Sequence, residues 1–236
     1  MHFILPCSSR FSISLYSHFQ KQNGSGFDSS RSEPNLYDML SLSTPAPNPK
    51  DPSRILHYLY LGDRNNAKSL STLLRHDIKY IINCTPSKTI AKTVGCPCYY
   101  EKDPRFKYLR IPIFDDGGED LSVYFKSVYD FIENNKHSGN ILVHCRQGVS
   151  RSSSFVIGYL MRKCDFTMDE AVGYMKGIRP IIQPNAMFLS QLRIYEESLT
   201  LKKRACDTNK QHLPLNVAVD GPIEEPQVKR SRTSEQ

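Results

Sequence analysis

The chain has 236 residues, of which 39% are hydrophobic, and it carries a net charge of +7. That length provides one good-sized core or at most two small ones, and no apolar run approaches the roughly 18 residues that would cross a membrane. The positive charge is spread along the chain and forms no stripe interleaved with aromatic residues. We therefore expect neither nucleic acid nor a membrane as a partner.

The seven cysteines form an odd, irregular set that matches neither a secreted disulfide framework nor the ligand spacing of a zinc site. Only Cys96 and Cys98 lie close together, and no second pair follows them. We therefore expect no metal and no other cofactor. A reducing compartment fits this cysteine usage, so we expect a cytoplasmic protein, with the nucleus as an additional location suggested by the basic run 229–232.

Composition divides the chain into three parts. Residues 1–50 are rich in Ser, Pro, Asn and Gly and have too few apolar residues to offset their ordering entropy, so they are predicted to be a disordered tail. Residues 51–201 alternate apolar and polar positions and are predicted to form the one folded domain. Residues 202–236 are polar again and are predicted to be a second disordered tail.

The periodicity of the folded part predicts alternating strands and helices. The predicted strands cover residues 55–61, 78–84, 108–113 and 140–143. The predicted helices cover residues 65–75, 121–134, 152–163, 168–176 and 186–201. Asn185 is expected to cap the last helix. This order is typical of an α/β fold with a central mixed, mainly parallel sheet of about five strands flanked by helices.

The segment 144–152 reads His-Cys-Arg-Gln-Gly-Val-Ser-Arg-Ser and joins the predicted strand 140–143 to the helix 152–163. Ligands of such sheets bind at the carboxyl ends of strands, where Cys145 falls. Backbone N–H groups at a helix N-terminus favour an anion and the thiolate form of Cys145. Arg151 supplies a planar fork that can grip two phosphoryl oxygens. The pattern predicts a site that holds a tetrahedral dianion and attacks it.

The remaining residues of this segment receive supporting roles. Gly148 permits a tight turn towards the ligand, and Ser152 is expected to donate a hydrogen bond to the sulfur of Cys145. His144 is expected to orient the loop rather than to exchange protons. The residues expected to line the substrate site are Arg146, Gln147, Gly148, Val149 and Ser150.

Displacement at phosphorus also needs an acid for the departing oxygen. The segment 113–120 lies between a predicted strand and a predicted helix, and its glycines Gly117 and Gly118 predict a mobile loop. Either Asp115 or Asp116 is the candidate acid on this loop. As a carboxylate, the same residue would then activate the water that releases the phosphate.

The pattern His144-Cys145-x-x-Gly148-x-x-Arg151-Ser152 resembles the signature of the cysteine-based dual-specificity protein phosphatases. Residues 55–62 resemble the first strand of the MAP-kinase phosphatases in that family, residues 111–115 its acid loop, and residues 179–185 the segment that enters its last helix. The resemblance covers residues 54–200 in order. It implies a protein tyrosine phosphatase-like fold and a dual-specificity catalytic domain over residues 51–201.

The resemblance also implies an activity. A phosphatase of this kind hydrolyses phosphotyrosine and phosphoserine/threonine on proteins through a phosphocysteine, here at Cys145, with MAP kinases as candidate substrates. Its alignment places the acid at Asp115 rather than Asp116. Gln147 departs from the alanine common in MAP-kinase phosphatases, and Gly117-Gly118 replaces a more polar stretch, but neither change removes a required chemical group.

Two other functions remain open at this point. A phosphoprotein-binding module would use the same loop with little turnover. A phosphoinositide phosphatase is disfavoured, because relatives of that kind carry lysines inside the loop, whereas only Arg146 is charged among the variable positions here. The resemblance further suggests a reversible disulfide between Cys84 and Cys145 under oxidation. The sequence gives no indication of the oligomeric state.

Overall fold

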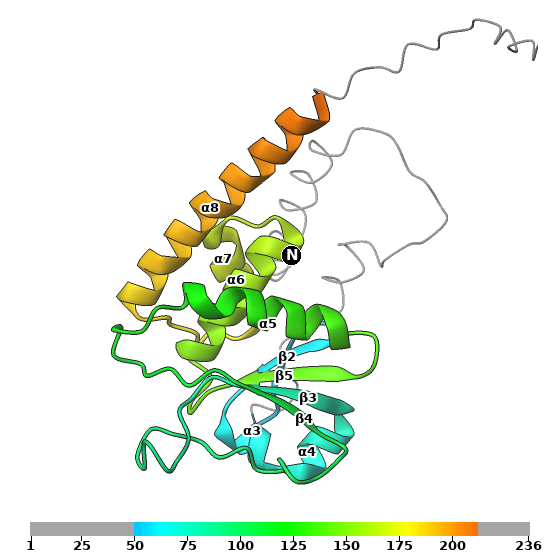
Figure 1. Cartoon of the computed structure of the whole chain (residues 1–236). Coiled ribbons are helices and arrows are strands. Elements are labelled where there is room, and N and C mark those ends of the chain that lie inside the picture. Colours follow the sequence, from blue (N-terminus) through cyan, green and yellow to red (C-terminus); the bar gives the residue numbers. More distant parts are fainter. Residues whose placement is uncertain (1–49, 212–236) are drawn as a thin grey trace, which may run out of the picture. The chain divides into compact units, whose positions relative to one another are not determined.

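A computed structural model of the chain describes residues 50–211, in which strands and helices alternate (Figure 1). The strands are β1 (Ser53–Leu56), β2 (Leu59–Gly62), β3 (Ile78–Asn83), β4 (Lys107–Arg110) and β5 (Asn140–His144). The helices are α3 (Arg64–Lys68), α4 (Leu70–Arg75), α5 (Ser122–Asn135), α6 (Arg151–Cys164), α7 (Met168–Ile178) and α8 (Ala186–Gln211).

The five strands form one sheet in the order β1-β2-β5-β3-β4. The neighbours β2, β5, β3 and β4 run parallel to one another, and β1 is antiparallel to β2. The predicted mixed, mainly parallel sheet is thus confirmed. Gly62 of β2 and Asn83 of β3 both pair with His144 of β5, so the carboxyl ends of three strands meet beside Cys145.

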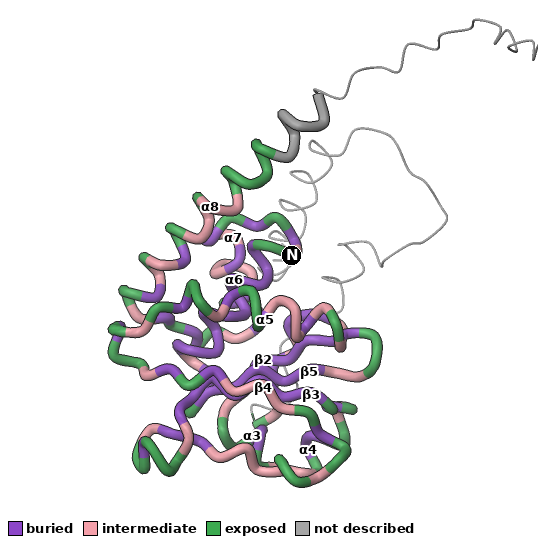
Figure 2. Tube along the Cα trace, viewed as in Figure 1, coloured by how far each residue is buried: buried purple, intermediate pink, exposed green. Residues whose placement is uncertain are grey.

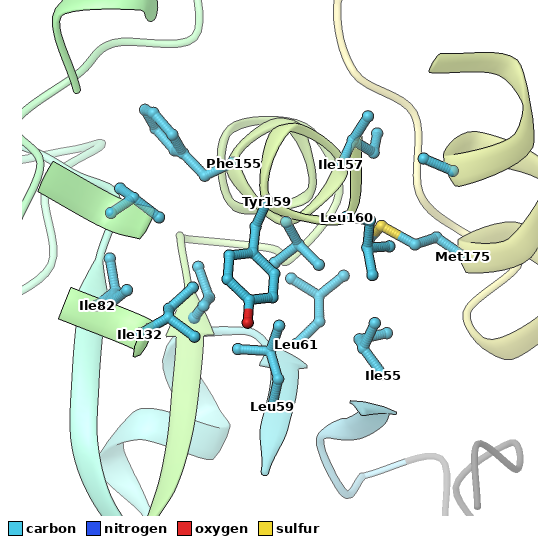
Figure 3. Close-up of a cluster of buried hydrophobic side chains, with 14 of the residues drawn as sticks. Ile55, Leu59, Leu61, Ile82, Ile132, Phe155, Ile157, Tyr159, Leu160 and Met175 are labelled. Carbon is cyan, nitrogen blue, oxygen red and sulfur yellow. The ribbon is translucent and has the colours of Figure 1, made fainter. Parts of the chain in front are cut away.

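Helices cover both faces of the sheet. Figure 1 places α5, α6 and α7 on one face and the short helices α3 and α4 on the other. Every residue of α6 from 151 to 161 is buried (Figure 2). Figure 3 shows Tyr159 of α6 pointing towards Leu59 and Leu61 of β2. Each such buried aliphatic side chain contributes about 1.5–3 kcal/mol, so packing fixes the helix that begins at Arg151.

Three predicted elements differ from the observed ones. The predicted strand 55–61 is the hairpin of β1 and β2, because the chain reverses at His57 and Tyr58, neither of which is a usual turn residue. The predicted helix 65–75 is two helices, since Ser69 ends α3 and caps α4 through its hydroxyl. The predicted strand 108–113 stops at residue 110, just before Pro112, which has no N–H for a ladder.

The last helix is longer than predicted. We expected it to end near residue 201 and a disordered tail to begin at 202, but α8 continues to Gln211. Residues 201–205 are Leu-Lys-Lys-Arg-Ala, all good helix formers, so their polarity did not indicate a loop. The other predicted tail segments, residues 1–49 and 212–236, lie outside the described residues. Between residues 50 and 211 no helix is both long and apolar enough to span a bilayer.

Candidate active site

The sulfur of Cys145 lies at the base of a loop between β5 and α6. Cys145 directly follows the last residue of β5 and is only 2% exposed. Its Sγ accepts hydrogen bonds from the backbone N–H of Gly148 at 3.2 Å and from the hydroxyl of Ser152 at 3.3 Å. The second of these is the predicted contact. Two donors directed at one sulfur stabilise a thiolate, both as nucleophile and as leaving group.

Only glycine fits at position 148. Its φ of +68° lies in the left-handed region. A Cβ atom at this position would also stand 2.5 Å from the carbonyl oxygen of Gly62 at the end of β2. The loop therefore packs directly on the sheet edge, and the predicted turn at Gly148 is present.

Arg179 supports the loop from outside, and sequence reasoning gave it no role. Its Nε donates to the carbonyl oxygen of Gly148 at 3.0 Å, and its Nη2 to that of Gln147 at 3.4 Å. A peptide carbonyl and the following N–H point in opposite directions. Because these carbonyls face Arg179, the N–H groups of Gly148 and Val149 turn into the loop. Such inward N–H groups form an anion-binding concavity.

The Nε of Arg151 is available to a ligand. Its side chain is 5% exposed, and its Nη1 donates to the carbonyl oxygen of Ile113 at 3.3 Å. Its Nε is buried without a hydrogen-bond partner, and Oδ2 of Asp115 lies 3.6 Å from it, beyond hydrogen-bond distance. An unpaired buried N–H is costly. A phosphoryl oxygen bound above Cys145 would satisfy it.

The structure brings Asp115, and not Asp116, to the loop. The Oδ1 atom of Asp115 accepts hydrogen bonds from Ser150 Oγ at 2.6 Å and from Asn185 Nδ2 at 3.1 Å. Asp116 instead accepts from the N–H of Gly118 within its own turn. Asn185 also caps α8, as predicted, by accepting from the N–H of Phe188 at 2.9 Å. Its second contact, to Asp115, was not predicted because it depends on the tertiary fold.

The other residues of the predicted site anchor the loop or face solvent. The carbonyl oxygens of Arg146 and Val149 accept hydrogen bonds from the N–H groups of Arg64 at 3.3 Å and Gln183 at 2.9 Å. The side chains of Arg146 and Gln147 are exposed. No group of three or more His, Cys, Asp or Glu residues within the described part of the chain is arranged to hold a metal ion.

His144 is a buried neutral residue beneath the loop. Its Nδ1 lies 3.2 Å from the carbonyl oxygen of Cys145, and its Nε2 is buried without a partner. Burial lowers the pKa of His144 from 6.5 to about 4. The imidazole is thus uncharged at neutral pH and suits the orienting role that the sequence predicted.

The lowered pKa of His144 predicts a loss of stability in acid. Below pH 6.5 His144 binds a proton in the unfolded chain, whereas in the folded chain it remains neutral down to about pH 4. The free energy of unfolding therefore falls as the pH is lowered through this window. This lowering of the His144 pKa corresponds to a loss of about 3 kcal/mol in the free energy of unfolding when the pH falls from 7 to about 4. Urea unfolding at pH 7 and pH 4.5 measures it. A His144→Asn variant is expected to lose less stability between the two pH values than the wild type, and an equal loss would contradict the assignment.

Cys84 lies beside Cys145 on the neighbouring strand end. Its N–H donates to the carbonyl oxygen of His144 at 2.8 Å, one residue beyond the paired Asn83 and His144. Neighbouring strands lie about 4.8 Å apart, which is within the Cα separation of about 4.4–6.8 Å that a disulfide needs. Both cysteines are free and buried.

This placement predicts reversible oxidation. Peroxide converts the thiolate of Cys145 to a sulfenic acid, and the thiol of Cys84 displaces its hydroxyl as water to form the disulfide. Dithiothreitol is expected to restore activity in the wild type but not in Cys84→Ser, in which Cys145 proceeds to the sulfinic acid. Peptide mass mapping after peroxide treatment provides the check. Sulfinic Cys145 with Cys84 still free in the wild type would overturn the prediction.

A nucleophilic cysteine in an anion-binding loop, a buried arginine and a nearby carboxyl group, at the carboxyl edge of a mainly parallel sheet, define the class of cysteine-based phosphatase folds. Residues 59–198 match the family described as dual specificity phosphatase, catalytic domain. The chain therefore belongs to the dual specificity phosphatase family.

Individual relatives agree with this assignment. The chain is 37% identical over 161 residues to human dual specificity protein phosphatase 6, covering 67% of this chain and 40% of that protein. It is 36% identical over 154 residues to a Xenopus laevis protein phosphatase Slingshot homolog, covering 65% of this chain and 21% of that protein. It thus spans less than half of either curated relative. The crystal structure of human DUSP28 superimposes with a TM-score of 0.56 at 30% identity, over 63% of this chain and 97% of that one.

Proposed function

We propose that this chain is a dual-specificity protein phosphatase that hydrolyses phosphotyrosine and phosphoserine/threonine through a phosphocysteine at Cys145, without a metal ion. The observation that carries the proposal is the convergence of three groups from separate elements. The sulfur of Cys145 accepts two hydrogen bonds, the Nε of Arg151 is buried without a hydrogen-bond partner, and a carboxyl oxygen of Asp115 lies 3.6 Å from that nitrogen.

In the first step the phosphoryl group binds in the loop, and its oxygens accept from the inward N–H groups and from Arg151. The thiolate of Cys145 attacks phosphorus, and the bond from phosphorus to the leaving oxygen breaks as Asp115 protonates that oxygen. In the second step a water attacks the phosphocysteine and gives its proton to Asp115. Cys145 leaves as the thiolate, to which Ser152 donates a hydrogen bond. Positioning and electrostatic stabilisation dominate transfers of this kind.

The contacts of Asp115 assign its acidic proton to one oxygen. Its Oδ1 already accepts two hydrogen bonds, from Ser150 and Asn185. When Asp115 acts as the acid, Oδ2, the oxygen that faces Arg151, is therefore the oxygen that carries the proton. When a phosphoryl group occupies Arg151, Oδ2 is the oxygen next to the leaving group. Ser150 and Asn185 thereby select the geometry of proton transfer through their contacts with Oδ1.

Phosphoproteins are the favoured substrates. Arg146 is the only charged residue among the variable positions of the loop, so no cluster of lysines is present there to meet the additional phosphates of an inositide. We propose MAP kinases as the particular substrates, on the resemblance of residues 55–62 to MAP-kinase phosphatases. We further propose a cytoplasmic location, with the nucleus as a second one.

Turnover of two substrates in EDTA tests the proposal. We expect the chain to release phosphate faster from a peptide doubly phosphorylated on threonine and tyrosine than from a phosphoinositide, measured as kcat/KM. Faster hydrolysis of the inositide would favour a lipid phosphatase. Binding of the phosphopeptide without phosphate release would favour the phosphoprotein-binding module.

A further inference from the structure

Gln191, on the first part of α8, contacts the acid loop at two backbone groups. Its Nε2 donates to the carbonyl oxygen of Glu119 at 2.8 Å, and its Oε1 accepts from the N–H of Leu121 at 2.7 Å. These partners lie about 70 residues earlier in the chain, where the acid loop enters α5 (Figure 1). Gln191 is half-buried, so solvent competes only partly with these bonds.

The pair of contacts requires a side-chain amide. One partner is a carbonyl oxygen that needs a donor, and the other is an N–H that needs an acceptor. Glutamine supplies both at the correct length, whereas glutamate at neutral pH supplies no donor. The Leu121 N–H stands at the start of α5, and Leu121 itself forms no side-chain cap; the next N–H, that of Ser122, donates to Oδ1 of Asp120 at 2.8 Å. Gln191 therefore connects α8, the loop and the first turn of α5.

These bonds complete the attachment of the acid loop. Arg151 holds the carbonyl oxygen of Ile113 at the start of the loop, and Ser150 and Asn185 hold Asp115. Beyond Asp115 the chain passes through two glycines, and Gly117 adopts a φ of +85°. Glycines do not restrain the backbone, so the geometry after Asp115 depends on attachments further along. Gln191 provides two of these, and the hydrogen bond from the N–H of Ser122 to Asp120 provides another.

We propose that Gln191 is a positioning residue that sets the orientation of Asp115 for proton transfer, and thereby the ability of the enzyme to expel poor leaving groups. The proposal rests on the proposed function. Gln191 does not touch the substrate. It acts through Asp115, so in the first step its loss affects only reactions in which the leaving oxygen needs a proton. Misplacement of a catalytic group by about 1 Å can cost up to 100-fold.

A comparison of substrates with different leaving groups distinguishes this positioning role from a purely structural one. A phosphoserine peptide has an alkoxide leaving group that requires protonation, whereas p-nitrophenolate leaves without much assistance. Gln191→Met keeps the length of the side chain and removes both hydrogen bonds. We expect kcat/KM, which reports formation of the phosphocysteine, to fall about 10-fold for the phosphoserine peptide, while kcat/KM for p-nitrophenyl phosphate changes less than threefold. Equal losses on both substrates would overturn the proposal.

Two further measurements keep the test decisive. Arg193→Ala, an exposed substitution two residues further along α8, is the matched control and should change neither rate. In an Asp115→Ala background, Gln191→Met should have no additional effect, because it acts through the missing carboxyl group. An additive loss in the double variant would overturn the proposal. If Gln191→Met fails to fold, Gln191→Glu, which removes only the donor, replaces it. A wild-type dependence on the leaving group in Gln191→Glu would then overturn the proposal. A wild type without turnover would instead overturn the proposed function itself.

Discussion

Replacing Cys145 with serine is expected to lower the hydrolysis of p-nitrophenyl phosphate by at least about 10⁴-fold, because enzymes accelerate such reactions by 10⁶-fold or more and the nucleophile is lost. A serine hydroxyl at this position remains protonated at neutral pH, and His144 does not activate it, because its Nδ1 is directed at the carbonyl oxygen of Cys145. The measurement is phosphate release at saturating substrate, in EDTA.

Binding should survive this substitution. The inward N–H groups and Arg151, which hold the phosphoryl group, are unchanged, so Cys145→Ser is expected to retain phosphotyrosine peptide with a Kd within about threefold of the wild type. Cys98→Ser is the matched control, since Cys98 is half-buried and its sulfur already accepts a hydrogen bond from Arg110. Turnover that persists in Cys145→Ser would exclude the phosphocysteine pathway.

The core of the site was predictable because its chemistry is local in sequence. Cys145, Gly148, Arg151 and Ser152 lie within eight residues, between a buried apolar strand and a helix, so the elements on either side fix their relative positions. The hydrogen bond from Ser152 to the sulfur was predicted on that basis. The mainly parallel character of the sheet was predictable in the same way, since buried apolar runs separated by helices favour parallel pairing.

The supporting contacts were not predictable, because they join residues far apart in the chain. Arg179 reaches the loop carbonyls across 31 residues, and Gln191 reaches Glu119 across 72. No periodicity or spacing indicates which polar side chain will meet which backbone group once the elements pack. The hairpin at His57 was predicted as a single strand for a different reason. Alternation of apolar residues continues through the turn, and no glycine, asparagine or aspartate interrupts it.

Replacing Asp115 with alanine is expected to lower kcat/KM for a phosphoserine peptide by about 10²–10⁴-fold, the usual contribution of general acid–base catalysis. The loss should be much smaller for p-nitrophenyl phosphate. Asp116→Ala is the matched control: it removes a neighbouring, exposed carboxylate whose hydrogen bond lies within its own turn. Equal losses in the two variants would mean that the acid is not at position 115.

Asp115→Ala should also bind substrate more tightly than the wild type. In the free enzyme Oδ2 of Asp115 stands 3.6 Å from Nε of Arg151. As a carboxylate it competes with the substrate for this guanidinium and repels the phosphoryl dianion. Its removal therefore leaves Arg151 free for phosphate while abolishing the proton transfer that completes the reaction. Calorimetric titration with phosphopeptide should show a lower Kd, and weaker binding would mean that Asp115 contributes to holding substrate rather than to releasing the leaving group.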